Sequence, residues 1–180
     1  MHLIPETVLL MKEEDFRKVV EENYGRIYRI CFHYFGNREE ANDAGQDILL
    51  KIWLNIDKFR GESALSTWIS RIAVNVCLAS FRDRRNGTVR IKPEEFLHLR
   101  DNIPDESDND PDKEEKLMFF HNFIHKLSSV DRTLVSLYLE DMESADIASV
   151  TGLTDVNVRT RIHRIKKQIK EEWEESYGTR

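Results

Sequence analysis

The chain has 180 residues, of which 40% are hydrophobic, and its 27 basic and 33 acidic side chains leave a net charge of −6. This length accommodates one ordinary domain or two small ones, and the hydrophobic content excludes a disordered chain. The acidic total excludes a uniformly basic surface. Charges act over only about 10 Å, however, so the local distribution of charge decides what the chain binds.

The sequence also bears on the compartment. No apolar run approaches the ~20 residues that cross a bilayer, and the first ten residues hold no cationic leader. The two cysteines, Cys31 and Cys77, lie in apolar periodic stretches without a CxxC pair, which is typical of buried free thiols. We therefore expect a cytoplasmic protein that inserts no segment of its own into a membrane.

Apolar residues at helical spacing predict three helices in the first half of the chain. The first extends from about Glu13 to Phe35, where Gly36 ends the run. The second has its inner face at residues 41–56, and the third follows a loop at 59–62 and continues to residue 80 with the cleanest amphipathic stripe of the chain. We expect these helices to form one compact bundle, in a domain of residues 11–85.

The middle of the chain loses this periodicity. Residues 86–112 are rich in Asp, Asn, Pro and Glu, and the stretch 86–116 alone has five basic and ten acidic side chains. Such a composition predicts a flexible acidic linker, because it buries too little apolar area to offset the entropy of ordering. One hypothesis is that the linker mimics nucleic acid and keeps the free protein off DNA; the alternative is a plain tether.

Helical periodicity returns in a second predicted domain, residues 113–175. Asp112 with Glu115 forms a capping box at the start of the fourth helix, and Ser129 is a candidate cap for the fifth. No strand pattern interrupts the chain. The fold class predicted from the sequence is all-α, with two small helical bundles joined by the acidic linker.

The most informative stretch, Ser144 to Lys170, has the pattern of a helix-turn-helix. Ser144 is a candidate cap for a short helix, Gly152 suits the left-handed residue that ends it, and Thr154 is a candidate cap for the next helix. That helix has one narrow apolar stripe, formed by Val158, Ile162, Ile165 and Ile169.

The remaining surface of this helix is cationic, with six basic residues and no acid between 159 and 170. A helix of this size fits the DNA major groove, where arginines and amides such as Asn157 read base edges and other cations bind phosphate. A solvated basic face on an ordinary amphipathic helix is the alternative interpretation.

Taken together, these features resemble the extracytoplasmic-function class of bacterial sigma factors, the promoter-recognition subunits of RNA polymerase. The segment DAGQDILLKIW (43–53) resembles the family's docking motif for the coiled coil of the polymerase beta-prime subunit. FRGESALSTWISRIAVN (59–75) resembles the segment that captures and melts the minus-10 element, and DIASVTGLTDVNVRTRIHR (146–164) resembles the helix-turn-helix that reads the minus-35 element.

The resemblance implies three sets of site residues. The docking residues are Asp43, Gln46, Asp47, Lys51 and Trp53. The minus-10 residues are Arg60, Gly61, Ser63, Ser66, Arg71, Asn75 and Arg82. The minus-35 residues are Thr154, Asn157, Arg159, Thr160, Arg161, Arg164 and Lys167. Trp68 is of a suitable type to stack on a base, but its place on the inward stripe favours a core role.

The resemblance further implies core RNA polymerase, with its beta-prime coiled coil and beta flap, as a partner, together with promoter DNA and an anti-sigma factor, often membrane-bound. Some positions depart from the family pattern. They include Ala44 and Gly45 beside the docking acid and residues 155–157, where a glycine-threonine pair often opens the recognition helix. The departure at residues 155–157 affects which promoter sequence we expect the helix to read.

Other functions are less well supported. His121 and His125 are four residues apart, but two ligands without a third are a weak metal signal, so we expect neither a metal nor a cofactor. No nucleophile, metal-protease or phosphate-loop motif is present, so we expect no enzyme. Two alternatives stay open: a stand-alone helix-turn-helix regulator whose first bundle binds a ligand or dimerises, and a helical adaptor with no role at DNA.

Overall fold

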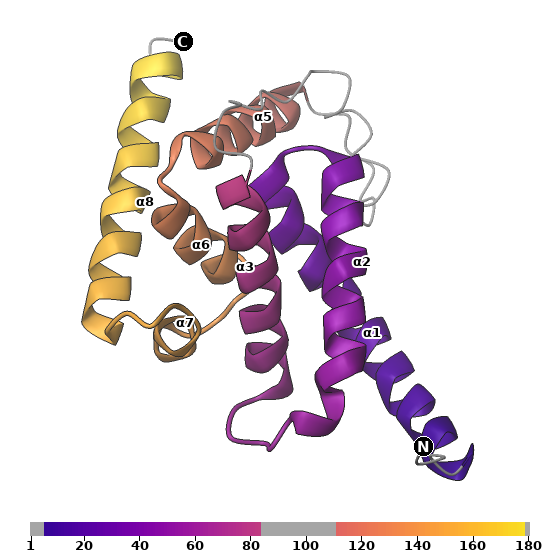
Figure 1. Ribbon diagram of the computed structural model, residues 1–180. Coiled ribbons are helices and arrows are strands. Elements are labelled where there is room, and N and C mark those ends of the chain that lie inside the picture. Colours follow the sequence, from indigo (N-terminus) through magenta and orange to yellow (C-terminus); the bar gives the residue numbers. More distant parts are fainter. Residues whose placement is uncertain (1–5, 84–110, 179–180) are drawn as a thin grey trace.

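The structure is a computed structural model that describes residues 6–83 and 111–178 (Figure 1). The predicted linker lies outside these ranges except for residues 111 and 112, and so does the hypothesis that it mimics nucleic acid. In the described part every regular element is a helix, as the sequence predicts. None of these helices combines the length and the apolar character that crossing a bilayer would require.

The first bundle consists of α1 (Glu6–Phe35), α2 (Arg38–Asn55), the short 3-10 helix η1 (Ile56–Lys58) and α3 (Leu65–Asp83). Helix α1 begins seven residues earlier than the periodicity predicts. Fully buried isoleucines from all three long helices fill its centre, among them Ile30, Ile48 and Ile69. This burial follows from the predicted stripes, since each helix turns its apolar face to the other two.

The second bundle consists of α5 (Pro111–Lys126), α6 (Ser129–Tyr138), α7 (Ser144–Thr151) and α8 (Asp155–Tyr177). Three of its predicted caps are displaced. Helix α5 begins at Pro111, so Asp112 is already its second residue rather than its cap. Ser128 caps α6 by accepting from the Asp131 amide at 3.1 Å. The N-cap of α7 is Glu143, whose side chain makes no capping hydrogen bond, and Ser144 is already the first helical residue.

The two bundles pack against each other through a shared buried cluster; a second, smaller cluster lies within the second bundle. Leu134 and Leu137 of α6, Ile147 of α7 and Val158 of α8 belong to the same buried cluster as the isoleucines of the first bundle. In Figure 1, α6 and α7 lie between the first bundle and α8, which forms the opposite edge of the molecule. The sequence pattern predicts each amphipathic face but not this shared core.

Hydrogen bonds reinforce the contact between the bundles. The Tyr34 hydroxyl is hydrogen-bonded to Thr133, and the buried guanidinium of Arg132 donates to the Tyr34 carbonyl at 3.2 Å. Arg29 of α1 forms a bidentate pair with the buried carboxylate of Glu140, at 2.7 and 2.6 Å. A bidentate guanidinium–carboxylate pair fixes both distance and orientation.

Three histidines lie where α1 meets α5. His121 and His125 of α5 stack with ring centroids 5.2 Å apart, and His33 of α1 lies 6.3 Å from His121. Within the described part of the chain, Nδ1 of His33, both ring nitrogens of His121 and Nε2 of His125 are buried without a hydrogen-bond partner. Burial lowers the pKa of His33 to about 3, of His121 to about 4 and of His125 to about 3.

Candidate nucleic-acid and polymerase interfaces

Helices α7 and α8 form the predicted helix-turn-helix. Gly152 ends α7 with φ 74°, in the left-handed region that glycine adopts without a steric penalty, and Thr154 caps α8 by accepting from the Asn157 amide at 3.3 Å. Val158, Ile162 and Ile165 of α8 are buried. The stripe therefore faces the protein and leaves the opposite side of α8 in solvent.

A buried carboxylate anchors two of the predicted minus-35 arginines. Asp131 of α6 accepts from Nη1 of Arg161 at 2.9 Å and from Nη2 of Arg164 at 3.2 Å. Arg161 also donates from Nε to the side-chain oxygen of Asn157 at 2.9 Å. These contacts hold the guanidiniums in fixed positions, because each has a partner of opposite charge or a polar neighbour.

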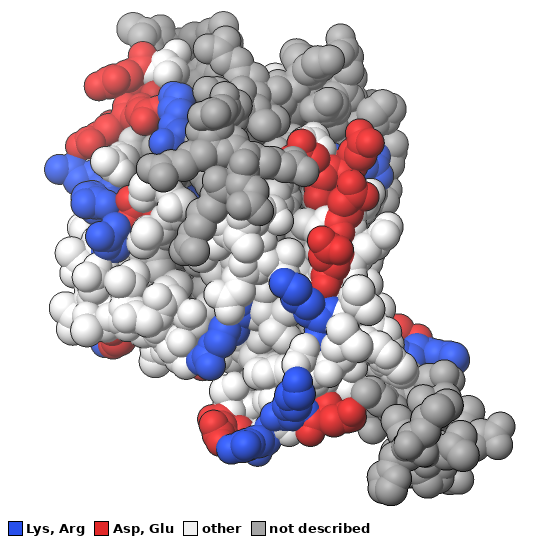
Figure 2. Space-filling model, in the orientation of Figure 1, with Lys and Arg blue, Asp and Glu red and all other residues white. Residues whose placement is uncertain are grey.

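The other predicted minus-35 residues lie along the exposed part of α8. Arg159 forms an ion pair with Asp155 one turn earlier, and Lys167 lies 3.5 Å from Glu171. Thr160 donates its hydroxyl to the Val156 carbonyl at 2.8 Å. Figure 2 shows basic side chains gathered along the middle of α8. All seven residues of the predicted set are thus on α8 or at its cap.

The sequence analysis missed two members of the solvent-facing ridge of α8. Positions 156, 160, 163 and 167 repeat the spacing of the buried stripe on the opposite side of the helix. Of these, Val156 and His163 are exposed and were not predicted. Searching the helix for basic residues misses Val156 and His163. Only their position on the side opposite the buried stripe identifies them.

The predicted minus-10 residues occupy the loop before α3 and one side of α3. Arg60 and Gly61 are exposed, and Gly61 has φ 71°. Asn75 is exposed on α3, while Arg71 donates to the backbone and hydroxyl oxygens of Ser149 in α7 at 3.0 and 2.8 Å. Ser63 and Ser66 are half-buried; the side chain of Arg82 lies outside the described part.

Trp68 packs as the sequence predicts. It is half-buried against the core, with its ring 5.5 Å from that of Phe59. Its indole is therefore committed to holding the loop against α3. This arrangement supports a core role.

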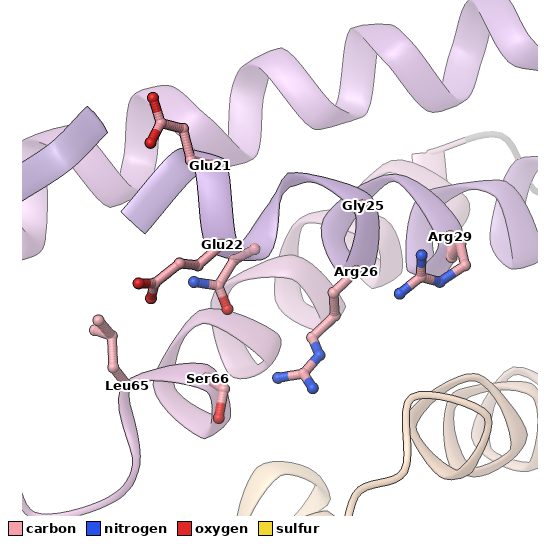
Figure 3. A pocket seen from close by; sticks show the side chains of 8 residues that line it. Glu21, Glu22, Gly25, Arg26, Arg29, Leu65 and Ser66 are labelled. Carbon is pink, nitrogen blue, oxygen red and sulfur yellow. The ribbon is translucent and has the colours of Figure 1, made fainter. Parts of the chain in front are cut away.

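A cleft of about 640 Å³ opens beside this loop, between α1 and the start of α3 (Figure 3). Arg26 and Arg29 line it from α1, and Ser66 lies across from them. Both arginines contact Glu140 of the second bundle, with Arg26 Nε 3.8 Å and Arg29 Nη2 2.6 Å from the carboxylate. Glu140 thus offsets one of these two positive charges as long as the bundles stay together, and Glu21 and Glu22 of α1 also line the cleft.

The predicted docking residues are on α2. Asp43, Gln46, Asp47 and Lys51 are exposed, and Figure 2 shows acidic side chains in a row over this helix. Trp53 instead packs edge-on against Phe16 of α1, with centroids 5.0 Å apart. The structure adds two residues that were not predicted, since Leu50 and Leu54 are 57% and 59% exposed on the same helix.

The described residues contain no group of three histidine, cysteine or carboxylate side chains arranged to hold a metal ion. The Cys31 and Cys77 sulfurs lie 3.9 Å apart, and both are buried as free thiols. The exposed surfaces present an acidic helix, α2, with two leucines and a basic helix, α8, with an outer ridge.

Comparison with known proteins agrees with this geometry. Residues 19–87 match the family described as Sigma-70 region 2, and residues 120–169 match Sigma-70, region 4. The first match covers α2, the loop and α3; the second covers the helix-turn-helix.

Relatives extend the match over most of the chain. It is 26% identical over 170 residues to the ECF RNA polymerase sigma factor SigW of Bacillus subtilis, covering 88% of this chain and 91% of that protein. It is 31% identical over 163 residues to the ECF RNA polymerase sigma-E factor of Haemophilus influenzae, covering 86% and 85%.

Among solved structures, the fold matches the sigma factor RpoE in complex with the anti-sigma factor NepR from Bartonella quintana. The TM-score is 0.67 and the identity 19%, over 88% of this chain and 96% of that one. The chain therefore belongs to the ECF sigma factors of the sigma-70 family, the subunits that direct RNA polymerase to promoters to begin transcription.

Proposed function

We propose that this sigma factor docks on the beta-prime coiled coil of core polymerase through the acidic, leucine-bearing face of α2, and reads the minus-35 element with the outer ridge of α8. The loop at 59–66 and the exposed side of α3 contact the minus-10 element. The observation that carries this proposal is the geometry of α8, in which a buried stripe and the Asp131 anchor present a fixed cationic surface to solvent.

The compact arrangement is, in this proposal, the free state of the protein. Elements named by positions −10 and −35 are about 25 base pairs apart, or about 85 Å along B-form DNA. A compact chain of this length has a radius of gyration of only about 16 Å. The two bundles must separate to reach both elements, and polymerase supplies the binding energy for that separation.

Separation also frees groups that the compact state occupies. Arg71, a predicted minus-10 residue, is released from Ser149, and Arg26 and Arg29 are released from Glu140. Each gains the capacity to bind phosphate. The free protein therefore binds DNA more weakly than the protein assembled on polymerase.

We further propose an anti-sigma partner and action in the cytoplasm, where the polymerase works. A fold relative, RpoE of Bartonella quintana, forms a complex with an anti-sigma factor. A partner that stabilises the closed arrangement of the bundles would keep this chain inactive. The protein itself carries out no chemistry, since bond formation belongs to the polymerase.

The test is transcription in vitro with purified core polymerase and a promoter library. We expect RNA chains that start at defined positions only when the chain and core enzyme are both present. Efficient, sequence-specific binding of duplex DNA by the isolated protein as a dimer would instead support a stand-alone regulator.

A variant tests the closed free state. Glu140→Ala removes the carboxylate that pairs with Arg29 and Arg26, and we expect it to weaken the contact between the bundles by about 1 to 3 kcal/mol. Small-angle scattering should then show a larger radius of gyration, and DNA binding without core enzyme should increase several-fold. Glu143→Ala, which removes an exposed acid nearby, should change neither; equal behaviour of the two variants would contradict the closed state.

A further inference from the structure

Val156, the second residue of α8, is 71% exposed. It is more exposed than any other large hydrophobic side chain among the residues that the structure describes. It belongs to neither of the buried clusters, nor to the half-buried residues that pack against them. Its side chain therefore contributes little to the stability of the fold.

Valine is also a poor choice for this position on conformational grounds. A β-branched residue loses side-chain freedom in a helix and is less favourable there than alanine or a straight-chain residue. An exposed valine there also gains nothing from burial within the fold. A contact made outside this chain would account for the residue.

The surroundings of Val156 restrict what it contacts. Thr160, one turn later on the same face, donates its hydroxyl back to the Val156 carbonyl. Arg159 is paired with Asp155, and Arg161 is held by Asn157 and Asp131. Val156 thus presents an apolar surface at the N-terminal end of α8, between charged groups that already have partners.

In the major groove only one base-edge group matches such a surface. Each base pair offers hydrogen-bond donors and acceptors there, and the methyl group at C5 of thymine is the one apolar feature of unmodified DNA. We propose that Val156 determines promoter specificity by packing against a thymine methyl group in the minus-35 element. This inference rests on the proposed function, because it requires α8 to lie in the major groove.

Replacing thymine by deoxyuridine removes that methyl group and changes no hydrogen bond. The experiment uses the full chain assembled with core polymerase and a promoter selected from a library, with each minus-35 thymine replaced in turn. Burial of one methyl-sized group predicts about fourfold weaker binding at one of these positions and no change at the others.

Variants assign the effect to Val156. Val156→Ala, which removes two methyl groups, should reduce the preference for thymine, whereas Val156→Ile, which keeps a branched apolar side chain, should retain it. Leu117→Ala, a truncation of an exposed apolar residue on α5, should keep the fourfold preference. Circular dichroism checks that each variant is folded.

The outcomes separate this inference from the function on which it rests. If the holoenzyme binds its promoter but no thymine position responds, if the selected element lacks thymine, or if Val156→Ala keeps the full preference, the inference is wrong and the proposed function stands. If the holoenzyme selects no promoter at all, both are wrong.

Discussion

Helices α2 and α8 are the two charged edges of the molecule, and they are built differently. On α2, Asp43, Gln46 and Asp47 make no side-chain hydrogen bond or ion pair with other described residues. On α8, Arg161 and Arg164 share the buried carboxylate of Asp131, and Arg159 is paired with Asp155. The first surface has free charges beside exposed leucines; the second has charges held in place.

The difference fits two kinds of recognition. Free acids next to Leu50 and Leu54 suit a protein partner, which supplies both the opposite charge and an apolar surface. Reading DNA needs fixed side chains, since every side chain immobilised on binding costs roughly 0.5 to 1.5 kcal/mol. In the proposed function, Asp131 lowers that cost by ordering the arginines before DNA binds. Two predictions test this comparison, and a third tests the joint between the bundles.

The largest effect is expected on α2. The double reversal Asp43→Lys with Asp47→Lys should reduce the affinity for core polymerase at least 100-fold, because two pairs of opposite charges become repulsive. Interferometry with immobilised core enzyme measures this affinity. The control is the double variant Glu21→Lys with Glu22→Lys, which makes the same change of charge at two exposed acids of α1. An equal loss of affinity in both double variants would contradict docking through α2.

A smaller effect is expected at the anchor of α8. Asp131→Ala releases Arg161 and Arg164, and we expect promoter affinity of the holoenzyme to fall about tenfold, while affinity for core enzyme is unchanged. Electrophoretic mobility shifts with and without the minus-35 element measure the loss.

Two further variants sharpen this test. Asp131→Asn keeps the shape and part of the hydrogen bonding, so it should lose less than Asp131→Ala. Glu172→Ala, which breaks an exposed ion pair to Lys126 near the far end of α8, should leave promoter affinity unchanged. An Asp131→Ala variant with full affinity would show that preordering is unimportant.

A third prediction concerns the stability of the joint between the bundles rather than binding. The folded-state pKa values of His33, His121 and His125, about 3, 4 and 3, are depressed below the ordinary value of 6.5. Burial is the main cause; the neighbouring histidines add to it for His33 and His125, followed by the cations Arg29 and Arg132. Below pH 6.5 the unfolded chain therefore binds more protons than the folded chain.

The stability that the folded protein gains from keeping these three histidines neutral is complete above pH 6.5. It is lost as the pH falls toward their folded-state pKa values. At pH 5.5 we expect a loss of about 1 kcal/mol for each histidine, measured as a lower urea midpoint than at pH 7.5. His121→Leu should show a smaller pH dependence than the wild type. The control His163→Ala removes an exposed histidine of α8 and should retain the full dependence.

Much of the helix-turn-helix, α7 and α8, was predictable from particular residues. Gly152, the Thr154 cap and the apolar stripe from Val158 to Ile165 are local signals, and the structure confirms each of them. Ser129 and Ser144 were wrong as caps, because backbone geometry makes each of them the first residue of its helix; the neighbouring Ser128 caps α6, and α7 has no side-chain cap. The roles of the docking, minus-10 and minus-35 residues stay predictions.

The sequence by itself determined the helices, the buried face of each helix and the family, because helix periodicity and capping depend on residues only three or four positions apart. Only the tertiary structure decided that Asp131 anchors the arginines of α8, that Glu140 binds Arg29 across 111 positions, and that the two bundles share a core. These contacts join residues far apart in the chain, and their partners are fixed by how the faces pack, which no local pattern encodes.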